Sequence, residues 1–238
     1  MQAPVEIIPL PQLVLSFAPV LIVAIIMWRW SSKSGLLAWA TARMLLQLVA
    51  IGYVLTFIFA ADHVPTILLV LAVMLMASSW IAIRPLKQRS PAVLTRALVA
   101  IAVGGLVTLA LVLGGVLNTS PWYSPQITVP VAGMIFSSAM NTVSLAAERL
   151  ELNEQRGLPV SEARIDALNT AMIPMINAFL AVGLVALPGM MTGQILAGVE
   201  PHVAVRYQIV VMCMTFGAAG ISAAVYLSLS AKHQTKTD

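Results

Sequence analysis

Polar side chains within long apolar segments are the residues of this sequence best suited to chemistry. Arg43 and Gln47 stand four residues apart, so they share one face of a helix. Such side chains cost free energy in hydrocarbon unless they face a cavity or a partner helix, and they therefore often mark a transport pathway. The alternative interpretation is that Arg43 extends its charge to the membrane surface while Gln47 hydrogen-bonds a neighbouring helix.

Two more groups of polar residues lie within long apolar segments. Ser138 and Asn141 cluster in one apolar segment, and Asn169 and Asn177 lie on either side of Pro174 in the next. A proline inside a helix frees a backbone carbonyl, which is tolerated at membrane depth where it lines a cavity or is covered by protein. Pathway lining and helix-to-helix hydrogen bonding are again the two interpretations.

Methionines concentrate in the last third of the chain. Their thioethers can ligate soft metals such as Cu(I), although filling irregular packing gaps is the commoner role of methionine. Met190 and Met191 stand between two glycines four residues apart, a spacing that permits either close helix approach or a sharp turn. The predicted pathway residues are Arg43, Gln47, Ser138, Asn141, Asn177, Met190 and Met191.

Catalytic and nucleotide-binding motifs are missing from the sequence. It contains no H-E-x-x-H, no G-x-S-x-G and no G-x-x-x-x-G-K-[ST] phosphate loop. The single cysteine, Cys213, excludes a cysteine-based zinc cluster within one chain, and the three histidines fall in loops or the tail. We therefore expect no enzyme activity and no cofactor bound by this chain, and the ligands of any transported metal are unknown. Any ATP must be bound by a partner.

Composition indicates which elements position these residues. Of 238 residues, 60% are hydrophobic and only 9% are charged, whereas about a quarter are charged in soluble domains. Backbone in lipid must satisfy its own hydrogen bonds, and long apolar runs favour helices. We predict an all-α polytopic membrane protein with about seven transmembrane helices: Leu13 to Trp30, Leu36 to Phe59, Pro65 to Ile83, Ala97 to Leu117, Ile127 to Ala147, Ala167 to Leu187 and Tyr207 to Ser230.

The distribution of lysine and arginine predicts the orientation. These spans place twelve of the 13 cations on one side and only Arg206 on the other. The positive-inside rule then puts the N-terminus outside and the C-terminus in the cytoplasm. It also explains the net charge of +4 without a nucleic-acid partner. The cytoplasmic cations are Arg29, Lys33, Arg43, Arg84, Lys87, Arg89, Arg96, Arg149, Arg156, Arg164, Lys232 and Lys236.

Two connections between spans have unusual sequences. The cytoplasmic segment 148–166 carries five acids and three arginines, and Gly157 and Pro159 predict a break between two short amphipathic helices there. The Gly/Pro-rich stretch Pro188 to Pro201 is a candidate re-entrant loop, which lipid permits only where protein shields the backbone.

Several stretches together resemble one known family. They are Leu187-Pro-Gly-Met-Met-Thr-Gly-Gln-Ile-Leu-Ala-Gly198 with Pro201 and Arg206 to Met212, then Arg43 to Leu55, Pro130 to Met134 with Asn141, and Ala171 to Pro174. These stretches closely resemble the FetB-like family of ABC transporter permeases. The resemblance does not extend to the link before the sixth span, which is shorter here and lacks the L-x-L-G-A stretch of the family.

The resemblance implies a permease subunit that pairs with a cytoplasmic ABC ATPase, which binds the ATP and magnesium. In bacteria this family is linked to iron export and resistance to oxidative stress, and its plant relatives to aluminium tolerance. It further implies a homodimer in the bacterial cytoplasmic (inner) membrane, with residues 1–238 forming one permease domain. The predicted ATPase-coupling residues in segment 148–166 are Glu151, Glu154, Arg156, Gly157, Glu162 and Arg164.

The main alternative is a secondary carrier or channel that works without an ATPase. Proton or sodium coupling usually uses Asp or Glu inside the spans, and none is present there. A membrane enzyme is a third possibility, with no catalytic motif behind it. Iron as the substrate rests on the resemblance alone, because oxygen-rich metal ligands are few in the spans.

Overall fold

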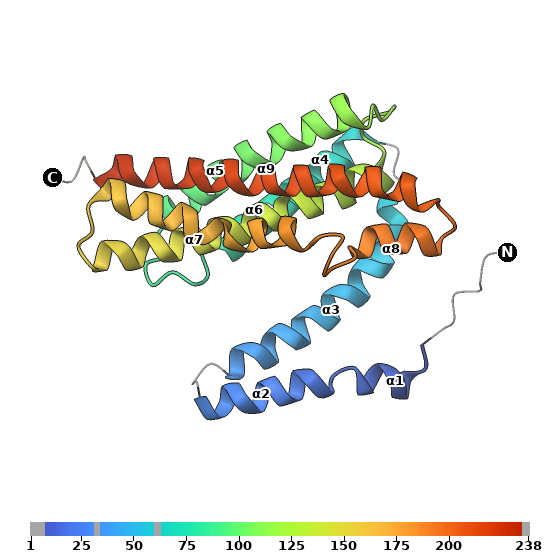
Figure 1. The fold of residues 1–238 in the computed structure, drawn as a ribbon, viewed down its shortest axis with the longest axis horizontal. Helices are drawn as coiled ribbons and strands as arrows, with labels where there is room; N and C mark the ends of the chain where they lie inside the picture. Colours follow the sequence, from blue (N-terminus) through green and yellow to red (C-terminus); the bar gives the residue numbers. More distant parts are fainter. Residues whose placement is uncertain (1–7, 31–33, 60–62, 235–238) are drawn as a thin grey trace. The chain divides into compact units, whose positions relative to one another are not determined.

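The computed structural model describes residues 8–30, 34–59 and 63–234, and within these ranges the chain is helical, without β-strands. Six of the described helical segments are long and apolar enough to cross a membrane, which confirms the predicted fold class. The chain divides into two compact units, residues 1–60 and residues 61–238 (Figure 1). Each unit is described by itself below.

The first unit consists of three helices. The first apolar stretch is interrupted after Leu15, where the Ser16 hydroxyl donates a hydrogen bond to the Leu13 carbonyl at 2.6 Å. None of the residues of the first two helices is buried, as expected for segments that have lipid as their solvent. The second and third helices contact each other. The bounds are α1 Leu10–Leu15, α2 Ala18–Trp30 and α3 Ser34–Phe59.

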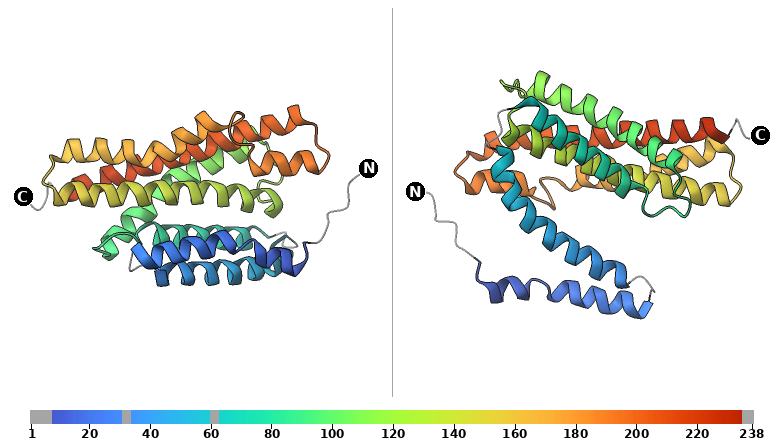
Figure 2. Two further views of the ribbon diagram at one scale, coloured as in Figure 1. Left: turned by 60° about the horizontal axis from the view of Figure 1, so that its bottom comes forward. Right: turned by 180° about the vertical axis from the view of Figure 1, so that it is seen from behind.

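The second unit is a helical bundle built around two long helices, α6 and α9. These two pack against each other and both contact α5 and α7, while α4 packs on α5 and α6 (Figure 2). Proline stands in the first turn of α4, α5 and α6, where its missing N–H costs nothing. The bounds are α4 Val64–Ala82, α5 Pro91–Leu111, the π-helical η1 Val112–Val116, α6 Pro125–Gln155, α7 Val160–Ala181, α8 Gly189–Leu196 and α9 Pro201–Gln234.

Small residues let the central helices approach closely. A Cβ atom on Gly104 of α5 would lie 2.8 Å from the backbone nitrogen of Ser222 on α9. A Cβ atom on Gly105 would lie 2.6 Å from the Phe136 ring on α6. Without a hydrophobic force between helices in lipid, such close van der Waals packing is a main source of bundle stability.

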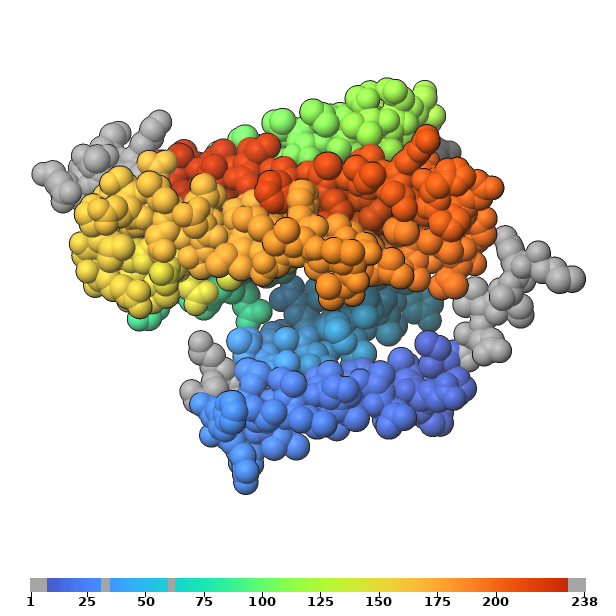
Figure 3. Space-filling model, in the orientation of Figure 1, coloured from blue at the N-terminus to red at the C-terminus, as the bar shows by residue number. Residues whose placement is uncertain are grey.

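The sixth predicted span, Ala167 to Leu187, is helical only as far as Ala181. Gly183 then adopts a φ of +81°, a conformation that favours glycine, and a β-bridge joins Val182 to Ala186. The chain continues through α8, which lies beside α9 on the face shown in Figure 3. In Figures 1 and 2, α7 and α8 run in the same overall direction, so the chain does not reverse between them. A re-entrant loop at 188–201 stays a prediction.

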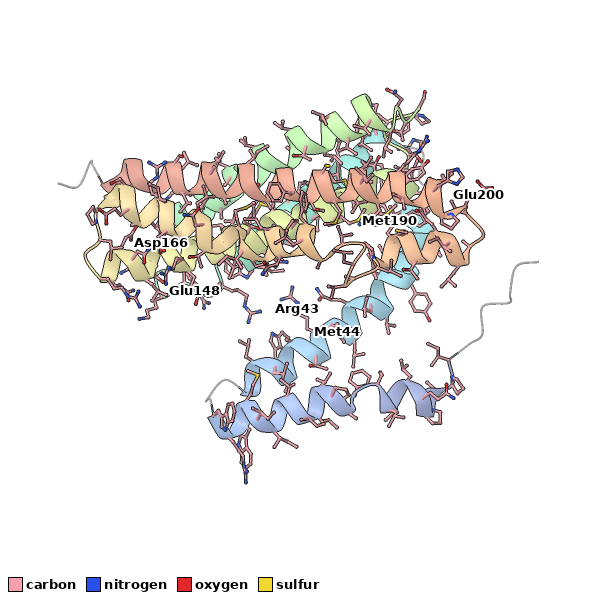
Figure 4. The ribbon with its side chains drawn as sticks, in the orientation of Figure 1. Arg43, Met44, Glu148, Asp166, Met190 and Glu200 are labelled. Atoms are coloured by element: carbon pink, nitrogen blue, oxygen red, sulfur yellow. The ribbon has the colours of Figure 1, made fainter. Side chains whose placement is uncertain are left out.

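Segment 148–166 differs in part from the prediction. The break occurs where expected, with Gly157 at a φ of +73° and Pro159 preceding α7. The flanking helices, however, are not separate short elements but the ends of α6 and α7. With 31 residues, α6 is about 46 Å long and exceeds the hydrocarbon thickness of about 30 Å, so its polar end extends past the hydrocarbon core. Figure 4 shows Glu148 and Asp166 at this end and Met190 and Glu200 at the other.

Candidate functional site: a polar helix face and a clamped hairpin

Asn141 of α6 and Asn177 of α7 are both exposed in the second unit, although α6 and α7 pack against each other. Neither side chain hydrogen-bonds another residue in the part of the chain that the structure describes. Asn169 of α7 is exposed as well. Because hydrocarbon cannot satisfy an amide, these side chains require a polar partner outside the second unit or a water-filled pathway.

Ser138 has a different environment from its neighbour Asn141. Its hydroxyl lies 3.0 Å from the Thr215 carbonyl of α9 and 3.5 Å from the Met175 sulfur of α7, and it can donate to one of them at a time. This geometry is the helix-to-helix bonding considered above, and it ties α6 to its two neighbours. Its role in a pathway stays a prediction.

Arg43 and Gln47 lie on one face of α3, in the first unit. Arg43 is half-buried and Gln47 is exposed. Figure 4 shows the Arg43 side chain extending from α3. That Arg43 and Gln47 line one pathway together with Asn141 and Asn177 of the second unit stays a prediction.

Met190 and Met191 fall on the short helix α8, and Met190 lines a cavity of the second unit. Met190 is 39% exposed and borders a cavity of about 760 Å³ together with Met134 of α6 and Gln194 of α8. Met191 is half-buried and does not line it. Among the described residues no cluster of three His, Cys, Asp or Glu side chains is placed to hold a metal ion.

The end of α6, the turn 156–159 and the start of α7 form a helical hairpin. A hydrogen-bonded clamp joins its two helices. The Arg149 Nε donates to Asp166 Oδ2 at 2.6 Å, and the Asn153 Nδ2 donates to the same oxygen at 2.7 Å. Asn153 Nδ2 also lies 3.2 Å from the Ala163 carbonyl, and its residue is only 1% exposed. This clamp was not predicted from the sequence. The spacing of four between Arg149 and Asn153, which puts them on one helix face, was the available signal.

The clamp holds Asp166 in its charged form. Hydrogen bonds from Arg149 and then Asn153 lower the pKa of this carboxyl below its ordinary value of 3.8, outweighing desolvation, which raises it. Because the folded-state pKa is lowered, the clamp stabilises the hairpin above that ordinary value and loses this contribution as pH falls through the folded-state pKa. Solvent screens the ion pair, since its side chains are 32% and 39% exposed.

The predicted coupling residues divide into two groups. Glu151 accepts hydrogen bonds from the backbone N–H groups of Lys87 and Gln88, at 3.2 and 3.3 Å, and Arg164 donates to the Ser228 hydroxyl of α9 at 3.1 Å. These two residues therefore fasten the hairpin to the rest of the unit. The other four are exposed on or near the turn: Glu154, Arg156, Gly157 and Glu162.

Glu151 connects the hairpin to the α4–α5 link, which carries several of the predicted cytoplasmic cations. We predict that Glu151→Ala frees this link, because two backbone amides lose an ionised acceptor. Trypsin cleavage after Lys87 or Arg89 in inside-out vesicles should then accelerate about tenfold, as expected for a local opening that becomes easier by about 1.4 kcal/mol. The matched control is Glu148→Ala, an exposed carboxylate one turn earlier. Equal cleavage of both variants would contradict the role given to Glu151.

A charged cleft of about 380 Å³ lies beside the hairpin. Arg96 of α5, Glu154 of α6 and the buried Tyr226 of α9 border it. These residues are far apart in the sequence, and only the packing of α5, α6 and α9 brings them together. The predicted cytoplasmic end of the second unit thus presents a turn, a cleft and a basic link side by side.

Comparison with known proteins agrees with this architecture. Residues 10–234 match the model of "Uncharacterised protein family (UPF0014)". The chain is 33% identical over 232 residues to "UPF0014 membrane protein slr1647" of Synechocystis, covering 89% of this chain and 90% of the relative. It is also 33% identical over 226 residues to "Probable iron export permease protein FetB" of Escherichia coli, covering 87% and 86%.

A plant protein is similar to the same degree. The chain is 35% identical over 206 residues to "UPF0014 membrane protein STAR2" of rice, covering 79% of this chain and 70% of the relative. No solved structure matches the chain. A family match over nearly the whole length and relatives above 30% identity confirm the resemblance found in the sequence: this multi-span membrane protein belongs to the UPF0014 family.

Proposed function

We propose that this chain is the permease subunit of an ATP-driven exporter of metal ions, in the bacterial inner membrane. The observation that supports the proposal is that α6 and α7 each carry an exposed asparagine without a hydrogen-bond partner among the described residues and end in the predicted cytoplasmic hairpin. Asn141 and Asn153 are both on α6, and Asp166 and Asn177 are both on α7. A displacement of the hairpin would therefore reach the amides at membrane depth through rigid helices.

The hairpin suits contact with a soluble ATPase. Its exposed residues Arg156 and Glu162 lie at the tip, while the clamp and Glu151 fix the hairpin to the bundle. A force applied at the tip by ATP-driven closure would thus be transmitted instead of being absorbed by a loose loop. Nucleotide binding belongs to the partner in this proposal, consistent with the missing phosphate loop.

The exposed amides favour a pathway between two copies of the chain. Asn141 and Asn177 offer amide oxygens, which suit hard and borderline cations, and their neutrality keeps binding weak enough for release. Pairing with a second copy would also remove both amides from lipid. Iron is the proposed cargo because a relative with 33% identity is named a probable iron export permease.

Reconstitution with the cognate ATPase tests this function. Inside-out vesicles that contain the chain and the ATPase should accumulate iron when ATP is added, and Asn141→Leu with Asn177→Leu should reduce the rate at least tenfold while both proteins still assemble. Wild-type accumulation that persists in ATP-depleted vesicles would replace the proposal with a secondary carrier or channel. Absence of any ATP-dependent metal movement in the assembled complex would overturn it.

A further inference from the structure

The cavity of about 760 Å³ lies at the end of the second unit opposite the hairpin, between α6, α8 and α9. It begins near the start of α6, at Gln126, and reaches Met134, which lies about 12 Å further along the helix. This end is the predicted outer side of the membrane. The cavity therefore extends from headgroup depth into the outer half of the hydrocarbon region.

The lining of this cavity is mostly apolar and carries no charged side chain. Its size falls within the range of cavities that hold organic ligands. Met134 and Met190 contribute flexible thioethers, which can adapt to an apolar ligand of variable shape. Gln194 is one of its few polar residues, and its buried Oε1 accepts no hydrogen bond from the described residues. A ligand with a hydrogen-bond donor would remove the cost of this unpaired oxygen.

A second cavity of about 360 Å³ adjoins the first, because Leu117, Val203 and Tyr207 line both. Arg206 borders the second cavity and is exposed. It is the single cation on the predicted outer side, and it forms no ion pair within the described ranges. An apolar cavity and an unpaired guanidinium are thus adjacent, near the α8–α9 turn.

We propose that these two cavities bind an anionic phospholipid of the outer leaflet. One acyl chain occupies the larger cavity between Met134 and Met190, and the phosphate lies against Arg206. A headgroup hydroxyl donates to Gln194, which a glycerol headgroup can supply. Arginine suits phosphate through its planar, multiply donating guanidinium, and the absence of charge inside the larger cavity disfavours an ion there. The site is independent of the proposed transport function.

Quenching of Trp122 fluorescence by brominated lipid tests this site. Trp122 is 45% exposed and stands close in sequence to Thr119 and Gln126, which line the larger cavity. The full chain would retain only this tryptophan and be placed in neutral phosphatidylcholine nanodiscs. A small fraction of dibromo-acyl phosphatidylglycerol or dibromo-acyl phosphatidylcholine is then added. The tryptophans replaced by phenylalanine are Trp28, Trp30, Trp39 and Trp80.

The expected result is a preference of about fivefold for the anionic quencher, as one arginine near an anionic headgroup provides. Arg206→Gln should remove the preference, and Arg206→Lys should retain most of it. Val203→Phe fills the junction of the cavities and should reduce quenching by both lipids, whereas Val205→Phe, on the 40% exposed neighbouring face, should not. Equal quenching by the two lipids, or a preference that survives Arg206→Gln, would overturn the proposal and indicate ordinary annular lipid.

Discussion

Asn153→Leu is expected to lower the stability of the second unit by about 1–3 kcal/mol and to uncouple the hairpin from a bound ATPase. The Asn153 amide is almost fully buried and donates toward Asp166 and the Ala163 carbonyl. Leucine has a similar volume but no donor, so the carbonyl loses a partner and Asp166 retains only Arg149. Thermal unfolding of the chain in nanodiscs measures the first effect, and stimulation of the ATPase by the chain measures the second.

The control for Asn153→Leu is Gln155→Leu, two residues further along α6. Gln155 is exposed and makes no hydrogen bond with another described residue, so its replacement should change stability by no more than about 0.5 kcal/mol. If both variants unfold at the same temperature, the clamp contributes nothing to the fold. If Asn153→Leu unfolds early but still stimulates the ATPase fully, the hairpin does not transmit the signal.

Most of the helices could be predicted from hydropathy alone, because lipid requires each span to satisfy its own backbone. The exception is the sixth span. Its end at Ala181 depends on the left-handed backbone of Gly183 and on a local β-bridge, which hydropathy does not report. The apolar run Leu184 to Leu187 extends the hydropathy signal past the true helix end. The end of α6 and the start of α7 lie outside the predicted spans for the opposite reason, since their polar sequences continue as helix past the apolar runs.

The candidate site could be predicted only where a single helix face defines it. The exposed amides Asn141 and Asn177 follow from a polar residue in an apolar run, and the structure leaves them exposed. The clamp joins residues of two helices across a turn, and the tie between Glu151 and the amide of Lys87 spans 64 residues. Such contacts depend on how α4, α6 and α7 pack, and a single sequence does not specify that packing.

Gly104→Ala adds only one methyl group, yet we expect it to disrupt the packing of α5 against α9 and to lower the stability of the second unit. The new methyl group would lie 2.8 Å from the Ser222 backbone nitrogen and would also meet the Ser222 hydroxyl. A hydroxyl can rotate away, but the backbone of α9 cannot, so α5 and α9 must separate. Overpacking of this kind costs about 1–3 kcal/mol, and in lipid no hydrophobic force restores the contact. The fraction folded during titration with a denaturing detergent measures the effect.

The control for Gly104→Ala is Gly217→Ala on α9, where an added Cβ would have no neighbouring atom within 4 Å. Alanine should be neutral or slightly stabilising there, because it has the higher helix propensity. The double variant Gly104→Ala with Ser222→Gly separates the two contacts. It removes the hydroxyl but leaves the backbone nitrogen, so we expect only partial recovery. Full recovery would assign the clash to the Ser222 side chain, and wild-type stability of Gly104→Ala alone would show that α5 and α9 do not approach as closely as described.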